Sequence, residues 1–241
     1  MLRGTHKSQA LGGLAFLLLA QAVTAGSFGV SPVRVALSAG QTTQMLTVRN
    51  TGDADTVVQV QPRAWLFQEG VDTLEASTDL IAVPPLFTLA PGGSQVVRVG
   101  LRQSPKPGSE LTYRLLLREV PPPRRGDITG LQVALELSVP VFVLPPGGAA
   151  PQLNWHILRN PDGNLELQGH NEGTSHVQVR NVRLQGAGGR VIETPALATY
   201  LLPDERHTWA LAGEAATGSR WRLTARTDAG EMEADLVIES D

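Results

Sequence analysis

The stretches YRLLLREVPPP at 113–123 and ITGLQVALELSVPVFVLP at 128–145 decide the fold of this chain. Both have the length and apolar content of β-strands, and because only RRGD lies between them they predict a hairpin. Residues two apart in a strand point to one face, so the second stretch carries one apolar row made of Leu131, Val133, Leu135 and Leu137. Two interpretations of this row are open. It packs on the core of its own domain, or it serves a partner.

The rest of the chain also predicts β-structure. The sequence is 41% hydrophobic and contains 25 Gly and 17 Pro, which is typical of a globular protein with many turns. Short apolar or alternating runs are separated by Gly, Pro, Asp and Asn, the pattern of antiparallel strands. Seven such runs precede the end of the second stretch, at 28–37, 44–50, 56–68, 80–89, 95–101, 111–120 and 128–143. Seven strands over this length indicate a β-sandwich.

A proline- and glycine-rich segment divides the chain into two domains. PPGGAAP at 145–151 has no side chains from which to build a core, so it predicts a linker. Further strand-like runs follow it and predict a second, smaller β-sandwich, at 153–158, 165–170, 176–185, 191–202, 207–211, 220–227 and 231–238. We therefore expect an N-terminal domain at 26–145, a linker at 146–151 and a C-terminal domain at 152–241.

The first 25 residues have the pattern of a secretory signal peptide. Arg3, His6 and Lys7 make a basic start, an apolar segment covers 11–22, and Val23-Thr24-Ala25 satisfies the small-residue rule for cleavage. The apolar segment is too short to span a membrane, because a spanning helix needs about 20 residues. The pattern predicts an exported, soluble protein.

Charge and cysteine content narrow the classes of partner. Without residues 1–25 the chain has 18 Lys and Arg against 23 Asp and Glu, a formal net charge of about −5. This balance argues against nucleic acid as a partner and leaves no polybasic patch for a membrane. The sequence has no Cys, so we expect the core alone to hold the exported domains together.

Catalytic and metal sites find little support. There is no Cys and no Gly-x-Ser-x-Gly motif, so we predict no catalytic residue, no cofactor and no small-molecule substrate. His170 and His176 stand close together in HNEGTSH, but six residues across a predicted turn is not a helical zinc spacing. We predict no metal site and interpret both histidines as surface turn residues.

Several segments together resemble the PapD-like periplasmic chaperones of the chaperone-usher pilus pathway. They are SPVRVALSAG at 31–40, VRNTG at 48–52, PPLFTLAPGGSQVVRVG at 84–100, YRLLLREVPPP at 113–123 and LQVALELSVPVFVLPPG at 131–147. Each segment alone is weak, but their order and spacing are specific. The second domain matches in size and strand content only. The SVPVFV form resembles the divergent Csu-type, or archaic, branch.

The resemblance implies an all-β fold of two immunoglobulin-like β-sandwich domains set at an angle, with a pilus subunit held in the cleft between them. In this family the subunit lacks its final strand, and the last strand of the chaperone's first domain fills the open groove. This is strand addition, in which main-chain hydrogen bonds give affinity and side-chain pockets give selectivity. It favours the partner interpretation of the apolar row and implies that Leu131, Val133 and Leu135 enter the groove, with Thr129 at the tip and Leu137 continuing the row.

The resemblance also implies a site for the subunit's C-terminal carboxylate. Arg34 occupies the position of the family's cleft arginine, whose guanidinium grips a carboxylate with two N–H groups. The family's second anchor is a lysine late on the donated strand, where this chain has Pro140. Since proline has no charge and no donor, we expect another arginine to serve, with Arg114 the first candidate ahead of Arg98 and Arg118.

These inferences predict a non-enzymatic periplasmic chaperone. It would bind pilus subunits that lack their final strand and deliver them to an outer-membrane usher. The free protein could also self-associate through the same strand, because an exposed strand edge invites pairing. The main alternative is a secreted or surface immunoglobulin-like adhesion or structural module, and a weaker one is a carbohydrate-active β-sandwich enzyme.

Overall fold

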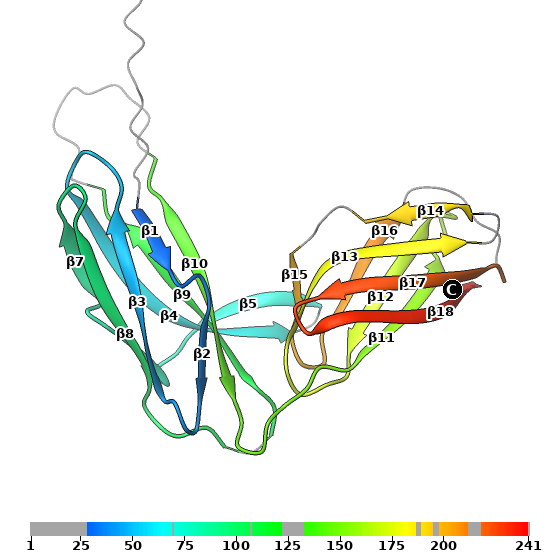
Figure 1. The fold of residues 1–241 in the computed structure, drawn as a ribbon, viewed down its shortest axis with the longest axis horizontal. Helices are drawn as coiled ribbons and strands as arrows, with labels where there is room; N and C mark the ends of the chain where they lie inside the picture. The colour runs from blue at the N-terminus through cyan, green and yellow to red at the C-terminus, as the bar shows by residue number, and fades with distance from the viewer. Residues whose placement is uncertain are drawn as a thin grey trace, which may run out of the picture.

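The structure is a computed structural model that describes residues 28–68, 70–106, 108–121, 133–186, 189–194, 198–211 and 218–240. The signal-peptide prediction at 1–25 and the predicted site residues Thr129 and Leu131 lie outside these ranges. All regular structure within them is β-strand, in two bodies joined at an angle (Figure 1). The prediction of an all-β fold with two immunoglobulin-like domains is thereby confirmed. The boundaries given above for the domains and the linker stay a prediction.

The first body is a sandwich of two sheets. One sheet has four strands in the order β1 (Phe28–Ser31), β3 (Thr43–Asn50), β8 (Ser94–Leu101) and β6 (Leu80–Val83). The other has six, with the order β2 (Val35–Ser38), β10 (Glu136–Leu144), β9 (Leu111–Glu119), β4 (Thr56–Gln68) and β5 (Val71–Ala76), while β7 (Leu86–Leu89) pairs with β4. Valines and leucines of both sheets form one core between them.

Two predicted runs are each divided between the sheets at a proline. The run 28–37 becomes β1 and β2, separated by Pro32, and the run 80–89 becomes β6 and β7, separated by Pro84 and Pro85. Proline cannot donate to a ladder, so strands end beside it. The peptide bonds Ser31-Pro32 and Val83-Pro84 are cis. A strand that changes sheets in this way leaves part of the neighbouring strand without a pairing partner.

The second body has eight strands around a separate core. In one half β14 (Val191–Glu193) and β15 (Thr199–Leu201) pair with β13 (Val177–Gly186), which is followed by β17 (Arg220–Thr227) and β18 (Gly230–Ser240). The other half is β11 (Leu153–Arg159), β12 (Leu165–Asn171) and β16 (Arg206–Leu211), and β18 joins it by pairing in parallel with β11. The core contains three tryptophans, Trp155, Trp209 and Trp221.

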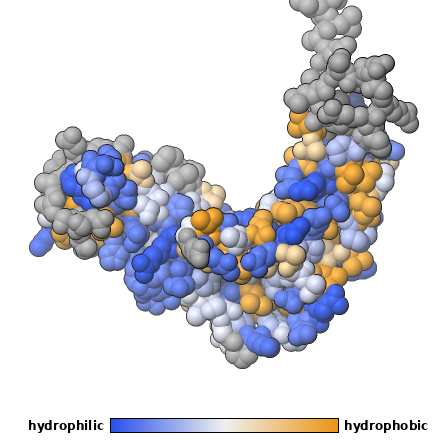
Figure 2. Space-filling model, turned by 180° about the vertical axis from the view of Figure 1, so that it is seen from behind, coloured by the Kyte–Doolittle hydropathy of each residue, from blue (hydrophilic) through white to orange (hydrophobic). Residues whose placement is uncertain are grey.

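The two bodies meet at an angle and leave a concavity between them (Figure 2). The hairpin of β4 and β5 extends from the first body toward β15 of the second (Figure 1). Within the described residues, no helix is long and apolar enough to cross a membrane. The relative orientation of the two bodies depends on the residues at which they join.

Candidate functional site

The apolar row predicted on the second stretch is divided by the structure. Strand β10 begins at Glu136, later than the predicted run at 128–143, and the described residues 133–135 precede it without strand structure. Leu135 and Leu137 pack partly buried against the core of their own domain, in line with the buried Val139. Val133 is 55% exposed. The row thus runs out of the core at its N-terminal end, where its side chains no longer have a covering sheet.

One edge of β10 is open over its first half. Strand β2 pairs with β10 only from Val141 to Leu144, while β9 pairs with β10 from Glu136 to Val143 on the other side. Residues 136–140 therefore have no second strand partner within the described part of the chain. The cause is the division at Pro32. Before this residue the chain belongs to the other sheet as β1, and it joins the sheet of β10 only at Val35, as β2.

The hydrogen-bonding groups at this edge follow from the register. Glu119 donates its N–H to the carbonyl oxygen of Leu135, so odd-numbered residues of β10 exchange bonds with β9. The even-numbered residues Glu136, Ser138 and Pro140 then direct their backbone groups to the open edge. Pro140 has no N–H, which suits an edge position.

A row of cationic side chains crosses the sheet beside this edge. Pro140 pairs with Arg114 on β9, and Arg114 pairs with Arg63 on β4. Arg34 lies one residue before Val35, which pairs with Val141, so Arg34 stands next to Pro140 in the same row. The structure thus brings the two predicted anchors, Arg34 and Arg114, to opposite sides of Pro140.

The other two candidate anchors lie elsewhere. Arg98 belongs to β8 in the opposite sheet, where it pairs with Met45. Arg118 lies further along β9, and its Nε atom is 2.6 Å from an oxygen of Glu136. Neither shares the row of Arg34, so Arg114 keeps its place as the first candidate on geometry.

Arg34 contacts the second body directly. Its Nη1 donates to Oδ2 of Asp228, which lies in the turn between β17 and β18, at 2.8 Å. The arginine side chain is 48% exposed and the aspartate side chain 13% exposed. Arg34, which is predicted to bind the carboxylate of a subunit, is therefore already paired with a carboxylate of its own chain.

Arg114 packs on aromatic rings. Its guanidinium carbon is 3.6 Å from the ring centroid of Trp65 and 5.5 Å from that of Tyr200 in the second body. Burial among these rings lowers the pKa of Arg114, and the nearby Asp72 opposes this change. The guanidinium remains charged, and its planar face is used for the contact with Trp65.

An apolar cluster seals the junction around these arginines. Trp65, Phe142 and Leu202 are each at most 3% exposed and form its centre, with Phe67 and Tyr200 packed against them. Phe142 follows Pro140 on the outward face of β10, so it is buried by the second body rather than by its own core. Since β10 carries both Phe142 and the open edge, the junction and the edge are mechanically connected.

The HNEGTSH segment is the centre of the junction and not a surface turn. His176 stacks on Phe142 with ring centroids 3.3 Å apart, its Nδ1 lies 2.6 Å from Oε2 of Glu110, and its backbone N–H donates to the same oxygen. His170 is only 9% exposed. The interpretation of both histidines as surface turn residues is therefore wrong. His170 lies in β12 with its ring nitrogens beside Glu172 and Asp204, and His176 is covered by Phe142 and Glu110 of the first body.

The same segment binds the linker. Thr174 donates its N–H to the carbonyl of Ala150, and Gln152 donates to the side-chain oxygen of the fully buried Asn171. Gly173 lies so close to the linker that a Cβ atom there would be 2.4 Å from the Ala150 oxygen. These bonds fix the linker on the second body.

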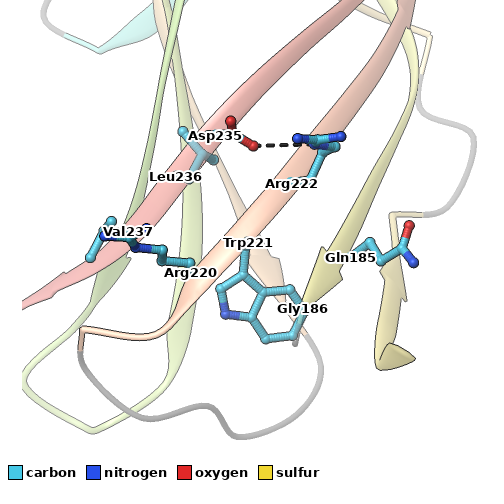
Figure 3. A pocket seen from close by; sticks show the side chains of 8 residues that line it. All are labelled: Gln185, Gly186, Arg220, Trp221, Arg222, Asp235, Leu236 and Val237. Carbon is cyan, nitrogen blue, oxygen red and sulfur yellow. Dashed lines mark hydrogen bonds and ion pairs between the residues drawn. The ribbon is translucent and has the colours of Figure 1, made fainter. Parts of the chain in front are cut away.

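A separate hollow on the second body lies far from this junction. It is lined by Gln185, Gly186, Arg220, Trp221, Arg222, Asp235, Leu236 and Val237 (Figure 3). Trp221 lies against Gly186, where a Cβ atom would meet its ring at 2.9 Å, and Arg222 pairs with Asp235 at 3.2 Å. The indole N–H of Trp221 donates to the hydroxyl of Ser219 at 3.1 Å. Within the described residues, no cluster of three or more metal-ligating side chains occurs.

Sequence reasoning missed Glu110 and Asp228 and assigned His176 to the surface. Their contacts join residues 66 and 194 positions apart, and no spacing or motif in the sequence signals them. The apolar row was found from the alternation of residues along the strand, and Arg34 was found because the resemblance marked its position.

Comparison with known proteins identifies one family. The family described as "Pili and flagellar-assembly chaperone, PapD N-terminal domain" matches residues 27–149. No curated protein matches this chain.

Solved structures share the fold. The CsuC–CsuE complex of chaperone and tip adhesion subunit from the archaic Csu pili of Acinetobacter baumannii has a TM-score of 0.68 at 19% identity, covering 88% of this chain and 99% of that chain. The E. coli chaperone DraB has a TM-score of 0.62 at 20% identity, covering 88% and 97%. The Salmonella enterica complex of SafA pilin and SafB chaperone has a TM-score of 0.62 at 21% identity, covering 90% and 98%. At such identities these similarities establish the fold.

Proposed function

Because this chain belongs to the family of pili and flagellar-assembly chaperones with a PapD N-terminal domain, we propose that it binds pilus subunits by donor-strand complementation and delivers them to an outer-membrane usher. The subunit would lack its final strand, and the segment from Thr129 to Leu137 would fill the groove. The chaperone would act in the periplasm, after removal of residues 1–25 as a signal peptide. No nucleotide or cofactor enters this mechanism, because strand exchange alone can transfer the subunit.

The open edge of β10 at 136–140 carries this proposal. A strand of a partner can pair there with the free backbone groups of Glu136 and Ser138, extending the six-stranded sheet. On the core-facing side the apolar row continues past Leu135 to the exposed Val133. The core of a subunit placed beside this edge would thus be continuous with the core of the chaperone.

The apolar part of the binding free energy has a useful magnitude. At about 25 cal/mol per Å², burial of Leu131, Val133 and the part of Leu135 that its own core leaves exposed contributes at most on the order of 5 kcal/mol before the cost of association is subtracted. Backbone pairing adds to this contribution. The same exposed row makes self-association of the free chaperone possible through the same edge.

A carboxylate site complements the strand. Arg34 and Arg114 flank Pro140 at the end of the open edge, so the end of a strand paired there would come close to both. Arg34 is the more accessible of the two, since it is half exposed whereas Arg114 is stacked between aromatic rings. We therefore assign the terminal carboxylate of the subunit to Arg34 and a supporting electrostatic role to Arg114.

Co-production with a pilus subunit tests the proposal. The subunit should be one encoded beside the gene for this chain, and the expected result is a stoichiometric complex in the periplasmic fraction. Val133→Asp should reduce capture at least tenfold, because it places a charge in an apolar groove. Val96→Asp is the matched control, since Val96 is 44% exposed on the opposite sheet. Equal capture by both variants would rule out the proposed strand.

The carboxylate assignment has its own pair of variants. Arg34→Ala should weaken capture, whereas Arg98→Ala, on the exposed face of β8, should not. Loss of the effect of Arg34→Ala when the subunit's C-terminus is amidated would support a direct contact with the carboxylate. An effect that persists with the amidated subunit would contradict it.

A further inference from the structure

The Arg34 site is filled by a carboxylate from the chain itself. Asp228 directs one oxygen, Oδ2, to Nη1 of Arg34 at 2.8 Å, and its other oxygen, Oδ1, accepts the backbone N–H of Gln178 at 2.8 Å. The backbone N–H of Asp228 in turn donates to the Gln178 carbonyl at 3.0 Å. The second body thus holds this carboxylate in a fixed position that faces the first body.

Asp228 has a histidine as its second neighbour. Nε2 of His176 is 3.9 Å from the same Oδ2 atom, too far for a hydrogen bond. The histidine is itself positioned by Glu110 and by stacking on Phe142. Its side chain is 12% exposed and that of Glu110 is 1% exposed, so neither moves freely.

We propose that Asp228 is an internal occupant of the Arg34 site, and that a partner's terminal carboxylate binds Arg34 by exchanging with it. Two carboxylates at one half-exposed guanidinium repel each other, so binding of the second displaces the first. The displaced Asp228 keeps its bond from the backbone N–H of Gln178. The identity of the partner as a pilus subunit rests on the function proposed above.

The exchange makes the site selective. A free carboxylate competes with a carboxylate that the fold already holds in place, so small acids bind less tightly than they would without Asp228. A strand paired on the open edge of β10 ends beside Pro140, and its carboxylate arrives at Arg34 at a high effective concentration. Asp228 is therefore a specificity-determining residue that admits carboxylates attached to a docked strand.

The exchange also acts on the junction between the bodies. Release of Asp228 removes the Arg34 contact, while the Glu110–His176 bond and the stacking on Phe142 remain. The two bodies thus stay joined when the site is occupied.

Acetate is a suitable probe, because it carries the carboxylate without a strand. Sodium acetate is titrated into the full chain at constant ionic strength, balanced with sodium chloride, and the Arg34 Nε–Hε resonance is followed by NMR. Its assignment comes from its loss in Arg34→Lys. Asp228→Asn keeps an oxygen for the Gln178 amide and removes the competing charge. It should lower the half-saturating acetate concentration at least fivefold.

Controls separate this result from a general effect. Asp235→Asn removes a carboxylate that pairs with Arg222 on the same body and should behave as the wild type. Should Asp228→Asn disturb the amide spectrum beyond its turn, Asp228→Ser provides a second uncharged side-chain oxygen. An unchanged or higher half-saturating concentration in the folded variant would overturn the proposal.

Subunit capture distinguishes this proposal from the proposed function. If the wild type captures no subunit while Asp228→Asn still sharpens acetate binding, the function fails and the exchange stands. If capture depends on Arg34 but the acetate titration is the same in both proteins, the exchange fails and the function stands.

Discussion

Glu205 gives the sharpest prediction of stability, because its carboxyl is buried in the turn between β15 and β16 with only 3% of the residue exposed. Burial raises its pKa to about 7, a backbone N–H donated by Leu202 opposes the rise, and the negative charge of Asp72 adds to it. Asp72 belongs to β5 of the first body, so the pKa of Glu205 reports on the contact between the two bodies.

The sign of the pH dependence follows from the raised pKa. The folded protein holds this proton more tightly than the unfolded chain, whose carboxyl has the usual value of 4.5. The contribution of this proton to the free energy of unfolding is therefore fully present below about pH 4.5, and it is lost as the pH rises through about 7. At about 1.4 kcal/mol per pKa unit, discounted for solvent screening, the loss is on the order of 2 kcal/mol between pH 5 and pH 8.

Glu205→Gln isolates this contribution. Glutamine keeps an oxygen for the Leu202 N–H but does not ionise, so the variant should lose less unfolding free energy than the wild type over this range. Urea unfolding followed by tryptophan fluorescence at pH 5, 6, 7 and 8 measures the difference. His207 contributes with the opposite sign in both proteins, because burial lowers its pKa, and it cancels in the comparison.

Two further variants complete this experiment. Asp72→Asn should reduce the pH dependence without removing it, since it removes only the smaller cause. Glu233→Gln, exposed on β18, should leave the wild-type profile unchanged. Parallel profiles of the wild type and Glu205→Gln between pH 5 and pH 8 would refute the burial argument.

Three other predictions concern the junction. Phe142→Ala should lower the unfolding free energy by about 3 kcal/mol and broaden the distance distribution in small-angle scattering, whereas Leu144→Ala, at a 38% exposed position, should cost less than about 1 kcal/mol. Gly173→Ala should destabilise by about 1–3 kcal/mol in urea, because its Cβ would overlap the linker backbone, whereas Gly29→Ala meets nothing within 4 Å and should be close to neutral. Arg114→Met should cost about 1 kcal/mol through the lost cation–π contact and change the fluorescence of the neighbouring indole; unchanged stability and emission would contradict the stacking.

The strands of the first body were largely predictable because their signals are local. Alternating apolar residues mark β3, β4, β8 and β9, and Gly and Pro mark the turns between them. The division of two runs between the sheets was not predicted, although Pro32 and Pro84 mark both places. Alternation records which side chains are buried, but it does not record which sheet buries them.

The site was predictable only in part. Arg34 could be located from the resemblance and the apolar row from the alternation of residues along the strand, but the partner of Arg34 could not be located, because Asp228 lies 194 residues away and aspartate in a turn has many local uses. The histidines of HNEGTSH were assigned to the surface for the same reason. Turn residues are usually exposed, and His176 is covered only because the first body packs on it.

Pro140 connects the two parts of the site. At this position the resemblance leads us to expect a lysine, so the proline at first indicates a lost anchor. Pro140 on β10 is buried and has no N–H, so a strand paired along Glu136 and Ser138 finds no donor at this position. Pairing should therefore stop at Pro140, with the end of the partner's strand between Arg34 and Arg114. The substitution that removes one cation thus defines where a carboxylate should arrive, and the arginines on the two neighbouring strands supply the charge.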